Sequence, residues 1–269
     1  MNADFLSAIV AQKREAVARL HAQTDATTRR QRALEERATA QPHRLRAAFI
    51  ADWPAIKIIA EFKRRSPSRG VIRSDLRPAT AARAYGRGGA CAISVLTDEP
   101  YFGGAIDDLI AARAATQLPI LCKDFFIDPI QIYEAALAGA DAILLIASIL
   151  GDADLARLRT TAEDELGLDA LIEVHSSDEL RRAVSAGASL IGINNRNLRT
   201  LDVSLQTSEE LIAQAPRDAI MISESGLQKA EDLRRLRSLG FSGFLVGEHL
   251  MQAADLESAL RELISAEEK

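Results

Sequence analysis

The sequence predicts a closed barrel of eight alternating strands and helices, a (β/α)8 barrel, with an N-terminal helical extension. From residue 56 onward, eight short aliphatic runs alternate with amphipathic stretches of helical period, a pattern typical of parallel sheets built from βαβ units. Several of the helical stretches end in a glycine just before the next strand. The chain has 269 residues, and barrels of about 250 residues commonly form one domain.

The predicted strands are short and rich in β-branched or aliphatic residues. They are IKIIAEF from Ile56, AISVL from Ala92, PILCK from Pro119, AILLI from Ala142, ALIEV from Ala170, LIGIN from Leu190, AIMIS from Ala219 and GFLVG from Gly243. An open doubly wound sheet of this length usually has fewer strands, so eight units favour closure. The sequence contains no GxGxxG or GxxxxGK[ST] segment, and nucleotide binding by those loops is therefore not expected.

Helix ends and starts between the strands are marked by residue type. Glycine closes the helices in RGGACAI, AGADAI, AGASLI and LGFSGF, where a left-handed residue ends the helix before a short loop. Ser177, followed by two acidic residues, and Asp128, followed by Pro129, mark two helix starts.

Residues 1–48 precede the first strand and predict one or two helices packed on a barrel that occupies residues 49–269. The two parts are expected to form one structural domain. The pattern leaves open whether the extension covers the mouth of the barrel. Its apolar stripe consists of Phe5, Leu6, Ile9, Val10, Val17 and Leu20.

Composition excludes several classes of protein. Hydrophobic residues make up 48% of the chain and charged residues 26%, which is a globular balance. The net charge is −5, and the basic residues of the N-terminal extension alternate with acids and lack interleaved aromatics, so no nucleic-acid partner is expected. Cys91 and Cys122 lie in apolar stretches without metal-ligand spacing and are expected to be buried free thiols.

The chain start lacks the apolar core and cleavage site of a signal peptide, and a cytoplasmic location is expected. The most apolar stretch, residues 138–150, is interrupted by Asp141 and is shorter than the roughly 20 residues that span a bilayer. No membrane association is predicted.

Charged and amide side chains stand at the C-terminal ends of five predicted strands, where barrels of this kind carry their catalytic groups. They are Glu61 and Lys63, Lys123 and Asp124, Glu173 and His175, Asn194 with Asn195 and Arg196, and Glu224 with Ser225. A buried ion-pair lattice is the structural alternative for any one of them. Lysines and carboxylates gathered at one face favour an acid–base site.

Two glycine loops predict a phosphate site. SESG (Ser223 to Gly226) follows the seventh strand, and VGEHLM (Val246 to Met251) follows the eighth and opens a short helix. Glycine allows close backbone approach, and free N–H groups attract an anion. Plain turn chemistry is the alternative. SPSRG (Ser66 to Gly70) adds hydroxyl groups after the first strand.

Other candidates are weaker. We expect His175 to point away from Glu173 along the strand and to serve packing. His21, His43 and His249 form no metal pattern, and no metal or cofactor is expected. Trp53, Tyr101 and Phe102 are candidates for an aromatic substrate pocket.

The motifs at these positions closely resemble the indole-3-glycerol phosphate synthase family over nearly the whole chain. The segments that carry the resemblance are IAEFKRRSPSRG, ISVLTDEPYFGG, LPILCKDFFIDPIQIYEAALAGADAILLI, LIEVH, IGINNRNL, SESG and FLVGEHLM. The resemblance implies a cofactor-free carboxy-lyase of tryptophan biosynthesis. It would convert 1-(2-carboxyphenylamino)-1-deoxyribulose 5-phosphate into indole-3-glycerol phosphate, with loss of carbon dioxide and water.

The resemblance also implies roles for individual residues. Lys123 would be the general acid and Glu173 its partner in proton transfer, while Lys63 would hold the substrate and Glu61 would orient the two lysines. The division of acid and base roles among them stays open. Substrate contacts would come from Asn194, Arg196, Ser225, Phe102 and Leu144, and phosphate contacts from Ser66, Gly226, Gly247 and the backbone N–H of Glu248.

Two departures and two rival interpretations accompany the resemblance. Cys122 stands where a larger residue is expected, and the extension before Phe49 is less familiar.

One rival is a barrel similar to phosphoribosylanthranilate isomerase, which would use a Cys–Asp pair where this chain has Glu61 and Lys63. The other is a catalytically silent partner in a complex with other tryptophan-pathway enzymes, which would lack the lysines and carboxylates present here.

Overall fold

The computed structural model describes residues 4–51, 56–198 and 200–265. Within them, eight parallel strands close into a barrel in the order β1-β10-β9-β8-β7-β6-β5-β4, and β4 pairs back with β1. This confirms the predicted (β/α)8, or TIM, barrel. The strands are β1 Ile58–Phe62, β4 Ala92–Leu96, β5 Ile120–Lys123, β6 Ala142–Ile146, β7 Asp169–Val174, β8 Leu190–Asn194, β9 Ile220–Glu224 and β10 Gly243–Val246.

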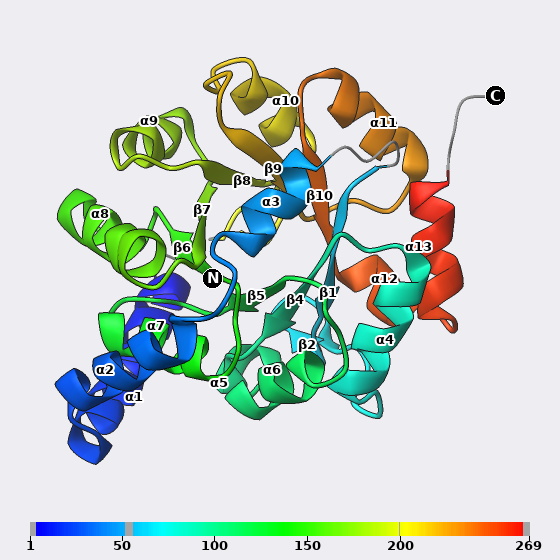
Figure 1. Ribbon diagram of the computed structural model, residues 1–269. Coiled ribbons are helices and arrows are strands. Elements are labelled where there is room, and N and C mark those ends of the chain that lie inside the picture. The colour runs from blue at the N-terminus through cyan, green and yellow to red at the C-terminus, as the bar shows by residue number, and fades with distance from the viewer. Residues whose placement is uncertain (1–3, 52–55, 199, 266–269) are drawn as a thin grey trace.

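Helices surround the barrel and connect successive strands (Figure 1). They are α4 Pro78–Gly88, α6 Ile106–Arg113, α7 Pro129–Leu137, α8 Asp152–Thr160 with a π-helical turn at Thr161–Glu165, α9 Ser177–Ser185, α10 Gln206–Ile212, α11 Ala230–Ser238 and α13 Leu256–Ile264. The short helices α5 Glu99–Phe102 and α12 Glu248–Gln252 and the hairpin of β2 Arg65–Ser66 with β3 Gly70–Val71 lie in loops that follow strands.

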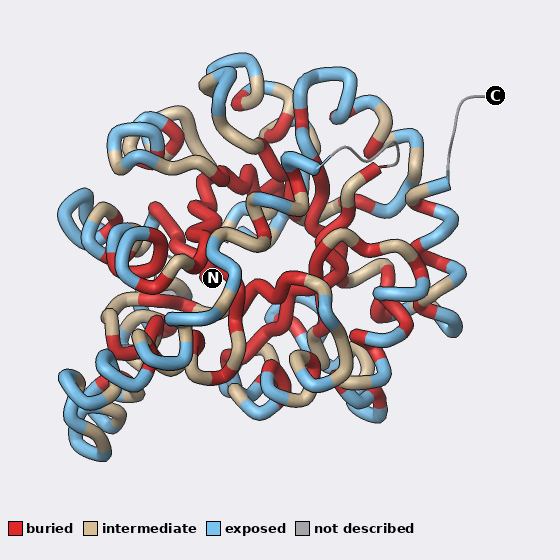
Figure 2. Tube along the Cα trace, in the orientation of Figure 1, coloured by how far each residue is buried: buried red, intermediate tan, exposed pale blue. Residues whose placement is uncertain are grey.

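Each strand is buried on both sides, which explains its continuous apolar run. Ile59 and Leu121 face the barrel interior, whereas Ile58 and Ile93 pack against the helices. Figure 2 shows the strands buried and the outer faces of the helices exposed. The side chain that alternates inward at the end of a strand therefore points into the mouth of the barrel.

The predicted helix boundaries hold closely. The glycines at the four predicted helix ends, Gly89, Gly139, Gly187 and Gly240, all have left-handed backbone. Asp128 caps α7, and its side chain accepts a hydrogen bond from the N–H of Ile130. At α9 the cap is Ser176, so Ser177 is the first helical residue instead of the cap.

The chain before β1 forms three helices, α1 Asp4–Gln23, α2 Ala26–Arg37 and α3 Arg44–Ile50, which we call the N-terminal arm. The boundary expected after residue 48 falls inside α3, which includes Phe49. Helix α3 crosses the end of the barrel that faces the viewer in Figure 1. Leu45 and Phe49 insert into the interior cluster there, and the N–H of Arg46 donates to Asp169 at the start of β7 over 2.8 Å.

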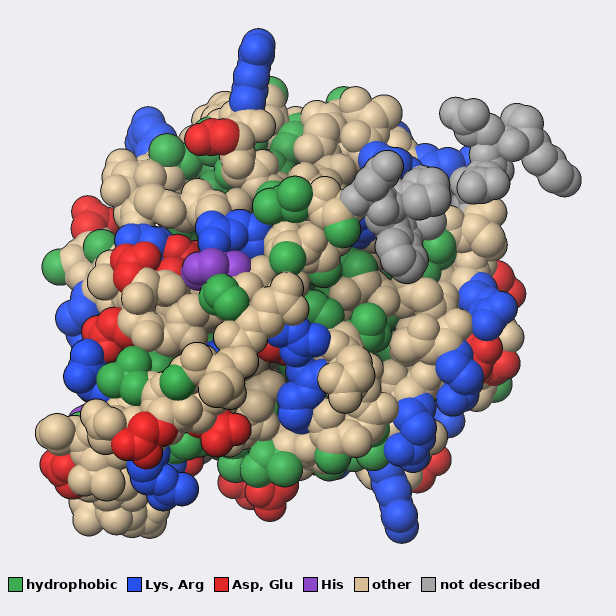
Figure 3. Space-filling view, in the orientation of Figure 1, with side chains coloured by type: hydrophobic (Ala, Val, Ile, Leu, Met, Phe, Trp, Pro, Cys, Tyr) green, Lys and Arg blue, Asp and Glu red, His purple; other side chains and the backbone are tan. Residues whose placement is uncertain are grey.

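Two further side-chain contacts fasten α3 at this end of the barrel. Arg44 donates to both carboxylate oxygens of Asp141 over 2.9 and 3.0 Å, and His43 lies 3.2 Å from Asp169. On the face seen in Figure 3, basic and acidic side chains are intermixed. That distribution differs from the single-sign stripe that nucleic-acid binding favours.

Candidate active site

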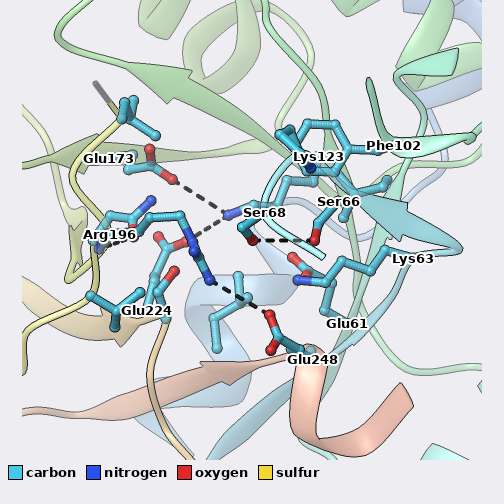
Figure 4. A pocket seen from close by; sticks show the side chains of 18 of the residues that line it. Glu61, Lys63, Ser66, Ser68, Phe102, Lys123, Glu173, Arg196, Glu224 and Glu248 are labelled. Atoms are coloured by element: carbon cyan, nitrogen blue, oxygen red, sulfur yellow. Dashed lines mark hydrogen bonds and ion pairs between the residues drawn. The ribbon is translucent and has the colours of Figure 1, made fainter. Parts of the chain in front are cut away.

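The C-terminal ends of the strands and their loops enclose a cavity of roughly 550 Å³, within the size range of small-molecule sites. All thirteen residues to which the sequence assigns catalytic, substrate or phosphate roles line it. They are Glu61, Lys63, Ser66, Phe102, Lys123, Leu144, Glu173, Asn194, Arg196, Ser225, Gly226, Gly247 and Glu248. Figure 4 shows the charged members converging from separate strands.

The ammonium of Lys123 contacts two carboxylates (Figure 4). Its Nζ is 2.6 Å from Oε2 of Glu224 and 3.5 Å from Oε2 of Glu173. Burial alone lowers the pKa of Lys123, but the negative charges of Glu224, Glu173 and Glu61 outweigh it and raise that pKa above the ordinary value. Lys123 is therefore a cation at neutral pH.

A second lysine–carboxylate pair stands at the end of β1. Lys63 Nζ lies 2.7 Å from Oε1 of Glu61, and both side chains are largely buried. Burial raises the pKa of Glu61, but Lys63 and then Lys123 outweigh that effect and hold it below the ordinary value. Glu61 is therefore ionised and couples the two lysines electrostatically.

Two glycines provide the space that the buried carboxylates occupy. A Cβ atom on Gly192 of β8 would lie 2.1 Å from Oε1 of Glu224, and one on Gly247 would lie 2.3 Å from Oε1 of Glu61. Both distances are far below van der Waals contact. Any larger residue at either position would displace a carboxylate that faces the lysines.

The side of the cavity near the β1 and β10 loops holds an arginine–glutamate cluster. Arg69 Nε lies 2.8 Å from Oε1 of Glu248, and Arg196 lies 3.6 Å from Oε2 of the same carboxylate. The N–H of Arg196 donates to Oδ1 of Asn194 over 2.9 Å. The Glu248 carboxylate is thus neutralised by two cations, and its own N–H stands at the start of α12, where it has no intrahelical acceptor.

The loop after β9 turns sharply at Ser225 and Gly226, which both have left-handed backbone with φ of 67° and 78°. For serine this conformation is uncommon and needs support from its surroundings. Asn195 supplies it, because its buried amide nitrogen donates to the carbonyl oxygens of Glu224 and Ser225 over 2.9 and 3.1 Å. The amide groups of this loop are thereby held at the wall of the cavity.

The apolar wall of the cavity contains contributions from the N-terminal arm. Leu6 and Ile9 of α1 line the cavity together with Phe102 and Leu144. Phe102 packs on Phe125 with ring centroids 6.2 Å apart. Helix α1 therefore covers part of the mouth, the point that the sequence pattern leaves open.

Lys13 fastens α1 to the ends of two strands. Its ammonium forms an ion pair with Asp98 at 2.9 Å and a second with Asp124. The hydroxyl of Thr97 donates to Asp124 over 2.9 Å, which fixes that carboxylate. Burial lowers the pKa of Lys13, but Asp124 and Asp98 outweigh it and raise it.

Comparison with known proteins decides the family. A model of the family described as indole-3-glycerol phosphate synthase matches residues 6–263. A protein of Azospirillum brasilense with that name is 50% identical over 208 residues, which are 77% of this chain and 79% of the relative. The chain belongs to the indole-3-glycerol phosphate synthase family. It is a carboxy-lyase of tryptophan biosynthesis.

Solved structures with low identity share the barrel alone. Thiamine phosphate pyrophosphorylase from Pyrococcus furiosus is 18% identical, with a TM-score of 0.58, covering 77% of this chain and 93% of that protein. Mandelate oxidase with (S)-2-phenylpropionate is 18% identical, with a TM-score of 0.56, covering 69% of this chain and 64% of that one.

One prediction within this synthase site is wrong. His175 does not point away from Glu173, because residues two apart on a strand face the same side. Its Nε2 lies 3.4 Å from Oε1 of Glu173. Of the aromatic candidates, Phe102 lines the cavity, Tyr101 lies outside its lining, and Trp53 lies outside the described residues.

Residues without a predicted role also belong to the synthase cavity. Glu224 makes the shortest contact to Lys123, and the sequence signal for it was its position at an inward-facing strand end. Arg69 and the α1 residues had no such signal, because they come from a loop and from a distant helix.

Both cysteines are free thiols; Cys122 is buried as expected, whereas Cys91 is only partly buried. Burial raises the pKa of each to about 12, which leaves them poor acids or nucleophiles.

No group of three or more potential metal ligands occurs among the described residues. No helix in the described part of the chain is long and apolar enough to cross a membrane.

Proposed function

We propose that this chain converts 1-(2-carboxyphenylamino)-1-deoxyribulose 5-phosphate into indole-3-glycerol phosphate, with Lys123 as the general acid. The observation that carries the proposal is the buried Lys123 ammonium, held at the centre of the cavity by Glu224 at 2.6 Å and Glu173 at 3.5 Å. A charged donor fixed in a site shielded from water stabilises negative charge that develops on a carbonyl oxygen.

Lys123 protonates the ribulose carbonyl oxygen, so that its carbon becomes electrophilic and is attacked by the ring carbon that bears the carboxylate. Loss of carbon dioxide restores the electrons to the ring. The hydroxyl formed from the carbonyl then departs as water while the neighbouring methylene carbon loses a proton, which forms the double bond of the indole. Glu173, whose Oε2 lies 3.5 Å from Lys123 Nζ, transfers the proton in this dehydration.

The remaining charged groups orient the substrate. Lys63, held by Glu61 at 2.7 Å, binds the substrate and keeps Glu61 ionised beside Lys123. Arg196, aligned by Asn194, faces the anthranilate carboxylate and the charge that develops there. These cations balance a substrate that carries both a carboxylate and a phosphate.

The phosphate binds between the loops after β1, β9 and β10. The Ser66 hydroxyl and the backbone amides of Ser225, Gly226, Gly247 and Glu248 surround this region of the cavity. Arg69 and Arg196 pair with the Glu248 carboxylate, so that side chain faces cations. The backbone N–H of Glu248 is left to bind the phosphate. Phe102 and Leu144 pack on the aromatic ring.

The decisive experiment is fluorescence detection of indole-3-glycerol phosphate with Lys123→Ala. Loss of a general acid costs about 10²–10⁴-fold in rate, so turnover should nearly vanish while substrate binding largely survives. Lys229→Ala, which removes an exposed lysine at the start of α11, is the matched control and should keep full activity. Undiminished turnover in Lys123→Ala would refute the assignment.

A further inference from the structure

His175 stands between the proposed proton-transfer residue and a second carboxylate. Its Nε2 lies 3.4 Å from Oε1 of Glu173, and its Nδ1 lies 3.2 Å from Oε2 of Glu179 in the first turn of α9. The backbone N–H of His175 donates to the same Glu179 oxygen over 2.8 Å. Glu179 therefore fixes both the main chain and the ring at the end of β7.

This geometry determines where the ring carries its protons. A carboxylate oxygen accepts hydrogen bonds, so the contact with Glu179 places a proton on Nδ1. A neutral ring would then direct the lone pair of Nε2 at the Glu173 carboxylate. The Nε2 atom is buried and has no hydrogen-bond partner among the described residues, so no other group relieves that repulsion. Only the imidazolium presents an N–H to both Glu173 and Glu179.

The charges around the ring also favour the imidazolium. Glu173 on β7, Glu179 on α9 and Glu224 on β9 face it with negative charge. Two cations act on its partners: Lys123 contacts the other oxygen of Glu173 at 3.5 Å, and Arg182 influences Glu179. Burial lowers the pKa of His175, but Glu179, Glu173 and Glu224 outweigh it and raise that pKa above its ordinary value.

We propose that His175 is a positioning residue whose imidazolium holds the Glu173 carboxylate aimed at the cavity, with Glu179 fixing the ring. Glu173 is then supported on both oxygens, by His175 on Oε1 and by Lys123 on Oε2. The inference rests on the role proposed above for Glu173. It assigns the loop between β7 and α9 a part in catalysis without contact to substrate.

The sign of the pH dependence follows from the direction of the His175 pKa. The imidazolium is present below the raised pKa and is lost as pH rises through it, so its benefit to kcat is confined to lower pH. In His175→Gln the ring charge is absent at every pH. We expect kcat of the variant to be about tenfold below wild type at pH values below the raised pKa and to converge with wild type at pH values above it.

A purely structural role predicts a different result, because lost packing lowers kcat by one factor at all pH values. A constant ratio of wild-type to variant kcat across the profile, or no change in kcat, would overturn the proposal. His21→Gln is the matched control, since His21 is partly exposed on α1 and pairs with Asp128 at 3.2 Å outside the cavity lining. Its ratio to wild type should be close to one throughout.

A second measurement uses the protein without substitution at His175 and does not depend on folding of the variant. Nitrogen-15 NMR of labelled histidines should show a protonation midpoint for His175 above that of a model histidine, with both ring nitrogens protonated below that midpoint. Glu179→Gln should lower this midpoint, because the amide keeps an acceptor for Nδ1 but removes the charge. A ring that is neutral near pH 6 would overturn the proposal. An inactive wild-type enzyme would instead refute the proposed reaction and leave the NMR test intact.

Discussion

Gly192 illustrates how one missing side chain shapes this site. It lies on β8 opposite Ile222 of β9, and the carboxylate of Glu224, two residues further along β9, occupies the space where a Cβ would stand. The glycine has ordinary strand backbone, so its requirement is for space. The position of Lys123 depends on it, because Lys123 makes its shortest contact with Glu224.

We predict that Gly192→Ala lowers kcat by about 10²-fold, since displacement of a catalytic constellation by about 1 Å has an effect of that size. Steady-state kinetics with the fluorescent product measure it. Gly151→Ala is the control, because a Cβ at that position meets no atom within 4 Å. Equal kcat in the two variants would show that Glu224 does not need the space.

At the residue scale, the sequence predicted which strand ends carry function but not how the side chains pair. The inward position of Lys123 and Glu173 follows from strand alternation, and the same alternation, applied correctly, places His175 beside Glu173. The contact of Lys123 with Glu224 joins two strands that are distant in sequence, and register across a closed barrel is not visible in either run alone.

At the scale of elements, the eight barrel strands were predictable because each is a continuous apolar run bounded by a turn residue. The β2–β3 hairpin and the π-helical turn after α8 were not, because each is only a few residues long and lacks a period. The position at which α1 docks on the barrel could not be predicted from the sequence either. Its apolar stripe signals that it packs somewhere, whereas the place is set by Lys13 meeting Asp98 and Asp124.

Lys13 provides the test of that docking. In Lys13→Met, Asp98 loses its cation while remaining almost fully buried, and we predict a loss of about 3 kcal/mol in the free energy of unfolding. We expect kcat to fall as well, since α1 lines the cavity with Leu6 and Ile9. Urea unfolding and steady-state kinetics measure the two effects.

The exposed pair of Arg181 with Asp178 is the comparison, and Arg181→Ala should change the free energy of unfolding by about 0.5 kcal/mol or less. A Lys13→Met protein as stable as Arg181→Ala would mean that the ion pairs do not hold α1.

At the scale of the whole molecule, the two ends of the barrel have separate tasks. The C-terminal end carries the cavity, and the N-terminal end is closed by α3, where Phe49 packs so tightly on β10 that a Cβ on Gly243 would lie 2.3 Å from its ring. Barrels of this architecture place function at the first end and stability at the second.

Phe49→Ala should therefore separate stability from activity. Deletion of this buried ring should cost about 3–5 kcal/mol in the free energy of unfolding, while kcat of the folded enzyme stays within about twofold of wild type. Calorimetry and kinetics below the melting temperature measure the two quantities. A large fall in kcat with little change in stability would contradict this division.

The N-terminal arm also has a consequence for the order of events during synthesis. It leaves the ribosome before the barrel does, yet His43 meets Asp169 across 126 residues and Arg44 meets Asp141 across 97. The barrel itself closes only when β10, the last strand, pairs with β1. The arm therefore stays an undocked amphipathic segment until the barrel surface that binds it has formed. Docking of its two ends onto the barrel is a late step of folding.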